Sequence, residues 1–539
     1  MNDAADVVVV GAGAAGAVLA ARLSEDPARR VILLEAGGRG ANPLLRVPLM
    51  TGILLRSRYA NWSFRTEAEA GLAGRSTAIP RGKVLGGSTA INGMVWARGR
   101  PSDYDGWAQS GLRGWAAEHA TAAFRRIERF SGGASDIHGG DGPLPITDAD
   151  VRHELIDAFL AAGAQAGYKP TDDFNAPPCE GVGRYHFTIA GGRRWSAATA
   201  FLRPAAQRAN LRIVTRAHAT RIVLEQGRAT GIAALVNGRE TIFRAPEIVL
   251  SGGAINSPQL LMLSGIGPAD QLRAFGIAVA ADLPGVGQNL HDHVLVRVEH
   301  ACTRPITLQS LTRLDRAAVA LVRALVSGTG PAASFPLAAG LMVRSDPAME
   351  EADLQSHFLP GLTTATLRVP FLAGPLRAGD GHGFMANISQ MRPESRGEIR
   401  LASADPLAAP RIRPNYLADA RDRTALRRGV AILREVFAQK AFDPYRGAEL
   451  SPGVDIRSDA EVDAWIARTA DTVHHAVGTC RMGSETDLGA VVDDRLRVRG
   501  IAGLRVADAS VMPRITSGNT AAPSMFIGQR CADFIANDA

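Results

Sequence analysis

The sequence is poor in cysteine, which occurs only four times in 539 residues. No two cysteines form a Cys-x-x-Cys pair, and their spacings match neither a zinc site nor a disulfide framework. We also expect no secretory leader, because the given sequence enters an apolar strand without a basic segment before it. We therefore expect no metal site and a location in the reducing cytoplasm, with peripheral association with a membrane as the alternative. The four cysteines are Cys179, Cys302, Cys480 and Cys531.

Lysine is rarer still, with three residues in the whole chain. The formal net charge of +7 is therefore carried almost entirely by arginine, and the arginines are scattered without a block of like charge. A scattered basic surface gives no reason to expect nucleic acid or a membrane surface as a partner. The longest apolar stretch, residues 317–343, is interrupted by Arg323 and Pro331, so we expect no integral membrane segment.

The start of the chain carries the signals of a nucleotide-binding turn. Four valines, Val7–Val10, are typical of a strand buried on both faces. Gly11, Gly13 and Gly16 follow in the spacing Gly-x-Gly-x-x-Gly, and residues 14–23 favour a helix. In such a unit the first glycine allows a tight turn, and the second lets a pyrophosphate approach the backbone. The third lets helix and strand pack closely, and the first N–H groups of the helix face the phosphates.

A second apolar strand, residues 31–35, completes this unit. It ends in an acid, Glu35, about 20 residues after the glycines, where the ribose hydroxyls of a dinucleotide would lie. A glycine motif alone is weak, but strand, glycines, helix, second strand and acid occur here in register. This segment therefore predicts a Rossmann-like dinucleotide-binding domain.

A second glycine-rich segment, residues 81–95, contains Gly86 and Gly87, followed by small hydroxyl residues and Asn92. Paired glycines of this kind let the backbone lie flat against a planar ligand and donate several N–H groups to it. Taken by itself, the pattern more often marks a structural turn before a helix, so both interpretations stay open.

The middle of the chain predicts a second domain inserted into the first. Residues 211–243 are typical of a meander of short strands, and residues 247–267 repeat the order strand, glycines, helix. From about residue 301 strands and helices alternate without such glycines, whereas residues 504–535 return to the first style and end in a helix. That closing helix should dock on the first domain. Further helices are predicted over residues 153–167, 197–209 and 421–437.

We therefore expect an α/β protein with a discontinuous Rossmann-like cofactor domain and a smaller sheet-and-helix (α+β) substrate-binding domain. The cofactor domain is assigned residues 1–150, 195–300 and 471–539. The substrate-binding domain is assigned residues 151–194 and 301–470, and its surface should face the cofactor.

Five segments in order resemble the glucose–methanol–choline (GMC) family of flavin-dependent alcohol oxidoreductases. They are residues 7–35, 81–92, 253–267, 475–478 and 508–520. The resemblance covers the chain end to end and is nearest to the bacterial choline-dehydrogenase-like and sorbose-dehydrogenase-like branch. It implies FAD as the cofactor and oxidation of the CH–OH group of an alcohol.

The resemblance also implies which residues contact FAD: the first glycines hold the pyrophosphate, Glu35 the adenosine ribose, and the 85–95 segment the isoalloxazine. The full set is Gly11, Ala12, Gly13, Ala14, Gly16, Glu35, Leu85, Gly86, Gly87, Asn92, Gly93, Met94, Val95, Ala219, His474, Asp508, Ala509 and Thr520. Some members link FAD covalently through a histidine in the glycine-rich block. This sequence has Ile91 at that position, so we expect FAD to be bound non-covalently.

By the same resemblance, His475 matches the active-site base and Asn519 the second active-site residue. A histidine that titrates near neutral pH can take the hydroxyl proton while hydride leaves the carbon for the flavin. The amide of Asn519 can orient the substrate oxygen, with a helix cap or turn as its structural alternative. His474 stays open between a backbone contact with the flavin and a structural role.

The expected substrate is a small, uncharged and primary alcohol. Relatives commonly carry Asn at the position of Phe335 and Glu at that of Ala338, so an acid that would face a cationic substrate is absent. The electron acceptor stays open between oxygen and a quinone- or dye-type carrier, with Val473 a hint towards oxygen. The alternative function is a flavoprotein of this fold that acts as a lyase or a light-driven decarboxylase. The presence of both His475 and Asn519 favours alcohol oxidation.

Overall fold

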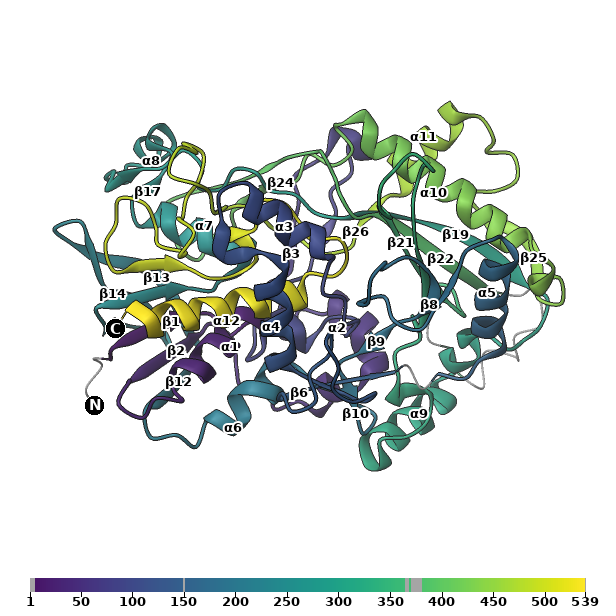
Figure 1. Ribbon diagram of the computed structural model, residues 1–539, viewed down its shortest axis with the longest axis horizontal. Coiled ribbons are helices and arrows are strands. Elements are labelled where there is room, and N and C mark those ends of the chain that lie inside the picture. The colour runs from purple at the N-terminus through teal and green to yellow at the C-terminus, as the bar shows by residue number, and fades with distance from the viewer. Residues whose placement is uncertain (1–4, 149–150, 364–367, 370–380, 539) are drawn as a thin grey trace.

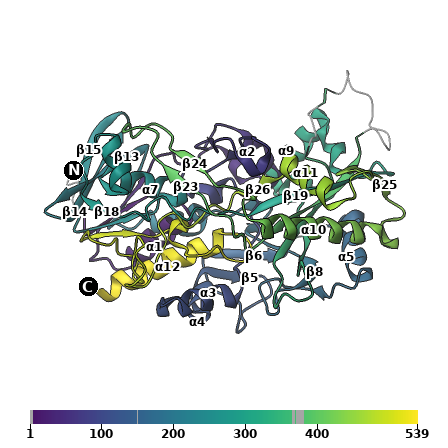
Figure 2. The same cartoon turned by 90° about the horizontal axis from the view of Figure 1, so that it is seen from above.

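The computed structural model describes residues 5–148, 151–363, 368–369 and 381–538. A parallel sheet and a larger mixed sheet lie toward opposite ends of the longest axis (Figure 1). The view from above in Figure 2 shows the same separation. The strands β13 to β15 (residues 217–244) lie at one end, and β25 (Arg446–Ser451) and α5 (Glu154–Gln165) lie at the other. No helix within the described ranges is long and apolar enough to cross a membrane.

The first sheet has five parallel strands and forms the predicted nucleotide-binding core. Its order is β12 (Leu211–Thr215), β2 (Val31–Glu35), β1 (Val7–Val10), β16 (Glu247–Leu250) and β27 (Leu504–Val506). All four residues of β1 are buried, as the valine run predicts for a central strand. The helices α1 (Ala14–Leu23) and α7 (Gly253–Leu263) follow β1 and β16, so both strand–glycine–helix predictions are confirmed.

The closing helix α12 (Ala521–Asp538) packs on α1, which confirms the predicted docking of the last helix on the first domain. Figure 1 shows the two helices side by side, one in yellow and the other in purple. Gly528 makes this approach possible, because a Cβ atom there would lie 2.3 Å from the carbonyl oxygen of Ala15. The turn that begins α1 is therefore supported by the end of the chain.

The predicted meander over residues 211–243 is partly wrong. Its first strand, β12, joins the parallel sheet beside β2. Only β13 (Ala217–Glu225), β14 (Arg228–Val236) and β15 (Arg239–Arg244) form a separate antiparallel sheet. The sequence pattern could not separate these cases, because a short apolar strand does not reveal its partner.

The second sheet lies between a layer of helices and the interior of the molecule. Its order is β25 (Arg446–Ser451), β19 (Val294–Cys302), β22 (Gly383–Gln390), β21 (Leu354–Leu359), β20 (Ala339–Val343), β8 (Gly181–Arg184) and β7 (Pro170–Thr171), with β26 (Asp471–Thr472) beside β19. The helices α5 (Glu154–Gln165) and α10 (Ala420–Ala438) cover one face and confirm two predicted helices. The strands β19 and β26 belong to this sheet and lie close to the predicted domain boundaries at residues 300/301 and 470/471. The domain boundaries themselves stay predictions.

Other elements depart from the predicted pattern. Residues 197–209 form a short π-helix, Ala198–Leu202, and a single turn, α6 (Arg203–Ala205), instead of one regular helix. Pro204 explains the break, because a proline cannot donate the backbone hydrogen bond of a continuing helix. The remaining helices are α2 (Thr51–Arg56), α3 (Pro101–Gln109), α4 (Ala117–Ile127), α8 (Ala269–Ala274), α9 (Leu314–Ser327) and α11 (Asp459–Thr469).

Candidate active site

A cavity of about 1120 Å³ runs from the parallel sheet to the second sheet. At one end it is lined by Val10, Leu34 and Leu250, which lie at the carboxyl ends of three neighbouring parallel strands. Ligands of open α/β sheets bind outside this edge. The far end is lined by residues of β19, β21 and β22, so one space connects the nucleotide-binding edge with the second sheet.

The three fingerprint glycines have different surroundings. A Cβ atom on Gly16 would lie 2.0 Å from the carbonyl oxygen of Gly11, and one on Gly11 would lie 2.3 Å from that of Ser251. A Cβ atom on Gly13 would meet no atom within 4 Å, because this residue faces the cavity. Since the unpaired N–H groups at the start of α1 follow at once, the space beside Gly13 fits a pyrophosphate.

Glu35 lies buried at the same edge, where the ribose was expected. Its Oε1 accepts a hydrogen bond from the Gly37 amide at 2.8 Å and its Oε2 one from the Ala12 amide at 3.0 Å. Burial raises the pKa of this carboxyl group to about 7, against the two amides and the charge of Lys83. Each oxygen keeps a second lone pair, so ribose hydroxyls can donate to a carboxyl group that is already fixed in place.

Four of the predicted cofactor residues do not line the cavity: Ala12, Gly16, Leu85 and Gly86. Ala12 accepts a hydrogen bond from the Gly86 amide at 2.8 Å, and Leu85 donates to the Gly38 carbonyl. Gly16 packs on Gly11, as described above. These residues join the two glycine-rich segments. The predicted residues that do line the cavity are Gly11, Gly13, Ala14, Glu35, Gly87, Asn92, Gly93, Met94, Val95, Ala219, His474, Asp508, Ala509 and Thr520.

Asp508 and Arg194 position parts of this wall. Asp508 accepts hydrogen bonds from the Gly253 amide at 2.8 Å and the Ser257 hydroxyl at 2.6 Å, so it ties β27 to the start of α7. Arg194 was not singled out from the sequence. Its buried guanidinium donates to the side-chain oxygen of Asn92 at 2.8 Å, and burial lowers its pKa to about 9. It fixes the segment that was expected to lie against the flavin.

Both residues of the predicted catalytic pair line the cavity. His475 Nε2 lies 3.2 Å from the side-chain nitrogen of Asn519, and His475 Nδ1 lies 3.0 Å from Nδ1 of His293. The side-chain oxygen of Asn519 accepts a hydrogen bond from Gln355 at 3.4 Å, which orients its NH₂ group towards His475. His293 Nε2 lies 2.9 Å from the Met391 carbonyl.

This chain of contacts fixes where the protons lie. A carbonyl can only accept, so His293 must carry its proton on Nε2. Burial lowers the pKa of His293 to about 4, so the ring is neutral and its Nδ1 accepts from His475 Nδ1–H. His475 therefore keeps Nε2 unprotonated, as a general base requires. Burial, then His293 and Arg81, hold the pKa of His475 well below its ordinary value of 6.5.

The backbone of His475 is anchored by a buried acid. Asp292 Oδ1 accepts from the His475 amide at 2.6 Å, and Oδ2 accepts from the hydroxyls of Thr472 at 2.5 Å and Tyr416 at 2.8 Å. Neither Asp292 nor His293 was predicted as a site residue. Their function depends on a contact with residues about 180 positions later, which no local pattern reveals.

His474 shows features of both roles left open for it. Its φ of +67° lies in the left-handed region, and its carbonyl accepts from Arg81 Nη1 at 2.7 Å. Its ring lines the cavity, and its buried Nδ1 has no hydrogen-bond partner among the described residues. An orphaned nitrogen beside the cavity wall is consistent with a bound group that supplies the missing partner.

The far end of the cavity is built by strand alternation. In β22, Phe384, Ala386 and Ile388 point into the core under the helices, whereas Met385 and Asn387 line the cavity. The same alternation holds in the neighbouring strands β19 and β21. The cavity-facing residues of these two strands are Leu295, Arg297, His357 and Leu359.

One substrate prediction needs correction. Phe335 lines the cavity and packs on Gly93, where a Cβ atom would lie 3.0 Å from its ring. Ala338 does not line the cavity, because it is fully buried in the core of the second sheet. Among the described lining residues the acids are Glu35, Asp471 and Asp508. Glu35 and Asp508 lie at the cofactor edge, so Asp471 is the acid nearest the substrate end.

The geometry fits a class of protein: a dinucleotide-binding enzyme whose cavity also holds a histidine beside an asparagine. Family models agree, since the GMC oxidoreductase N-terminal model matches residues 5–295 and the C-terminal model residues 393–528. The chain belongs to the GMC oxidoreductase family. It is therefore an FAD-dependent enzyme that acts on the CH–OH group of an alcohol.

Similar proteins match over almost the whole chain. Oxygen-dependent choline dehydrogenase of Brucella ovis is 44% identical over 98% of this chain and 95% of its own length. Human mitochondrial choline dehydrogenase is 44% identical over 99% of this chain and 90% of its own. Among solved structures, pyridoxine 4-oxidase from Mesorbium loti has a TM-score of 0.88 at 33% identity, with 99% of both chains covered. These matches support alcohol oxidation and lend no support to a lyase or a decarboxylase.

Proposed function

We propose that this enzyme oxidises an uncharged primary alcohol, with His475 as the general base and Asn519 as its partner. The observation that carries the proposal is the position of His475 Nε2 inside the cavity, 3.2 Å from the side-chain nitrogen of Asn519. An alcohol hydroxyl that donates to Nε2 replaces the hydrogen bond from Asn519. The freed NH₂ group then donates to the alcohol oxygen as negative charge develops there.

The predicted cofactor residues fit FAD. Gly13 leaves room for the pyrophosphate, Glu35 offers acceptors to the ribose, and Gly93 and Met94 line the same cavity as His475. When bound, FAD supplies the acceptor for the hydride from the alcohol carbon. Ile91 lines the cavity and has no nucleophilic atom, which supports non-covalent binding. The protein supplies proton removal and orientation.

The walls of the substrate end support an uncharged alcohol. Arg297 Nη2 lies 3.4 Å from Asp471, so the acid nearest this end is already paired. Burial lowers the pKa of His357 to about 4, so its ring is neutral. A buried ammonium would find no free anion among the described lining residues, and Phe335 alone forms no aromatic cage.

Choline is the second candidate, because two relatives at 44% identity are named for it. Anaerobic mixing with an alcohol panel separates the candidates through the rate of flavin bleaching. We expect benzyl alcohol to bleach the flavin at least about tenfold more efficiently than choline, the effect of about 1.4 kcal/mol. Equal or faster bleaching by choline would show that the cavity does hold a cation.

A pair of variants tests the reason for this preference. Phe335→Glu places an acid on the cavity wall, and Phe335→Gln has nearly the same shape without the charge. We expect the glutamate variant to raise the choline to benzyl alcohol ratio and the glutamine variant to leave it near that of the parent. A similar ratio in both variants would mean that charge does not decide the preference.

For the electron acceptor we propose oxygen. The supporting observations are the printed names of the similar oxygen-dependent and oxidase proteins, and Val473, a small side chain that lines the cavity two residues before His475. Turnover in air should form one hydrogen peroxide per alcohol oxidised. Flavin that stays reduced in air but is reoxidised by a quinone would instead indicate a quinone-type carrier as the electron acceptor.

A further inference from the structure

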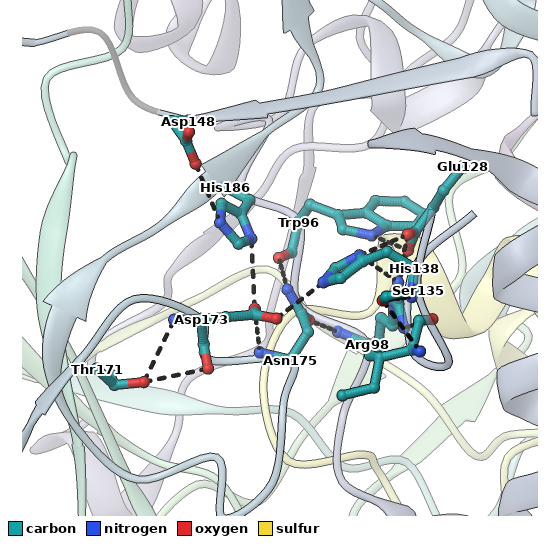
Figure 3. A network of polar contacts seen from close by, with 11 residues as sticks. Trp96, Arg98, Glu128, Ser135, His138, Asp148, Thr171, Asp173, Asn175 and His186 are labelled. Atoms are coloured by element: carbon teal, nitrogen blue, oxygen red, sulfur yellow. Dashed lines mark hydrogen bonds and ion pairs between the residues drawn. The ribbon is translucent and has the colours of Figure 1, made fainter. Parts of the chain in front are cut away.

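A second group of titratable side chains lies outside the cavity. His138, Asp173 and His186 come from three separate segments, and none of them lines the cavity. His186 belongs to β9 (His186–Phe187), while the other two lie in loops. Figure 3 shows Asp173 between the two imidazole rings. The reaction proposed above gives this group no role.

The three side chains have the spacing of a metal-binding triad. Asp173 Oδ2 lies 2.8 Å from His138 Nε2, and Asp173 Oδ1 lies 3.4 Å from His186 Nδ1. One ligand atom from each residue lies within 4.8 Å of the others. Ligands about 2.0–2.1 Å from one tetrahedral Zn²⁺ lie about 3.4 Å apart, so small shifts would bring all three onto an ion.

The far nitrogen of each ring faces a further carboxylate. His138 Nδ1 lies 2.9 Å from Glu128 and 2.7 Å from Nη2 of Arg98, which itself pairs with Glu128. His186 Nε2 lies 3.2 Å from Asp148 (Figure 3). This carboxylate–histidine arrangement is typical of metal ligands, because the outer acid fixes the tautomer that leaves the inner nitrogen free. Two such pairs converge here on one aspartate.

The inner nitrogen of His186 has no hydrogen bond. The side chain is only 3% exposed, yet Nδ1 finds no hydrogen-bond partner among the described residues, although Asp173 is near. A buried ring nitrogen without a partner costs free energy, so it indicates a missing ligand. The ring points its Nδ1 towards Asp173 (Figure 3).

The surrounding contacts hold the ligands in place. The Asn175 amide donates to Asp173 Oδ1 at 2.7 Å, and the His138 ring stacks on Phe130 with centroids 3.9 Å apart. The Asp173 side chain is 19% exposed, which leaves solvent access for a water as a fourth ligand. The site is therefore largely preformed and reachable from outside.

We propose that His138, Asp173 and His186 bind a divalent transition metal, with Zn²⁺ the best fit. Two imidazoles and one carboxylate suit Zn²⁺, whereas Ca²⁺ and Mg²⁺ prefer oxygen ligands.

The ion would brace one wall of the cavity. The Trp96 amide donates to the His186 carbonyl at 2.8 Å, and the Arg98 amide donates to the Asn175 side chain at 2.9 Å. Met94 and Val95, which line the cavity, directly precede these residues. The role is structural, since the three ligands lie outside the cavity.

Zinc binding by the FAD-loaded full chain tests the proposal. After chelator treatment, the protein is dialysed against ZnCl₂ near neutral pH, and bound zinc is measured by elemental analysis. We expect about one tightly bound zinc per chain and a rise in Tm. His186→Gln should lower zinc affinity more than about tenfold and remove the Tm rise. His119→Gln is the matched control, because His119 is partly exposed, lies outside the proposed site and, within the part of the chain that the structure describes, pairs with Glu118.

Two results would overturn the proposal. The first is a parent protein that retains no zinc after dialysis. The second is unchanged zinc affinity in His186→Gln, which would place the metal elsewhere. If that variant does not fold, Asp173→Asn removes a ligand with almost no change of shape and must show the same loss.

Discussion

Replacing His475 by alanine should abolish most of the proton transfer while leaving the cofactor in place. Among the described residues the ring forms hydrogen bonds with His293 and Asn519, and the backbone anchor to Asp292 does not need the side chain. A general base typically contributes 10²–10⁴-fold, or about 2.7–5.4 kcal/mol at 1.36 kcal/mol per factor of ten. We expect the rate of anaerobic flavin reduction to fall by that factor.

Asn519→Ala is the matched comparison within the same pair. In the proposed reaction Asn519 donates one hydrogen bond to the alcohol oxygen as charge develops there, worth about 1.5–3 kcal/mol, so its loss should slow the reaction about ten- to 150-fold. Stopped-flow bleaching at saturating alcohol measures both variants, and flavin content per chain controls for cofactor loss. A His475→Ala enzyme as fast as the parent would refute the base assignment and make His474 the first residue to test.

The pH profile of the parent enzyme gives an independent check. The sequence predicted a base that titrates near neutral pH, whereas burial, His293 and Arg81 hold the pKa of His475 well below 6.5. The active form is the unprotonated ring, which is present above the pKa. Flavin reduction should therefore stay constant as pH falls through 6.5 and decline only at lower pH. A midpoint at or above 6.5 would contradict this environment of His475.

Three further predictions concern the cofactor and its support. Acid precipitation should release free FAD into the supernatant, because Ile91 offers no atom for a covalent link; yellow precipitate would contradict this. Gly13→Ala should weaken FAD binding without lowering the Tm of the FAD-free protein. Gly16→Ala should lower that Tm, because its Cβ atom would lie 2.0 Å from the Gly11 carbonyl oxygen. A loss of Tm in Gly13→Ala but not in Gly16→Ala would contradict the described packing of these glycines. Glu35→Ala should lower the flavin content more than the folding yield, because each charged hydrogen bond to the ribose contributes about 1.5–3 kcal/mol to the free energy of FAD binding. Equal flavin content in variant and parent would argue against this contact.

The sequence predicts best what local backbone geometry demands. Gly11, Gly16 and the valines of β1 could be assigned because a tight turn, a close helix approach and a central strand each allow few residue types. Resemblance to the family supplied His475 and Asn519, which no local pattern marks, and the structure places them 3.2 Å apart. Their catalytic roles stay predictions.

What the sequence could not supply depends on segments that meet only in the folded chain. The tautomer of His475 is set by His293, 182 positions earlier. The cavity wall of β19, β21 and β22 arises from strand pairing across long intervals, so Leu295 and Asn387 show no local signal. Ala338 was expected to face the substrate because relatives carry an acid at this position, but the fold buries its side chain in the core of the second sheet. The His138–Asp173–His186 group escaped for the same reason, because its members are far apart in sequence.

The packing of α12 on α1 has a consequence for how the enzyme is made. On the ribosome, β1 and α1 emerge long before α12 exists, so the turn around Gly13 lacks its supporting helix during most of translation. Domains normally fold as units in the order of their synthesis, but this one must wait for its last helix. FAD should therefore enter only after α12 has emerged and packed on α1. Removal of α12 should leave a chain with an exposed apolar face on α1, prone to aggregation and to capture by chaperones.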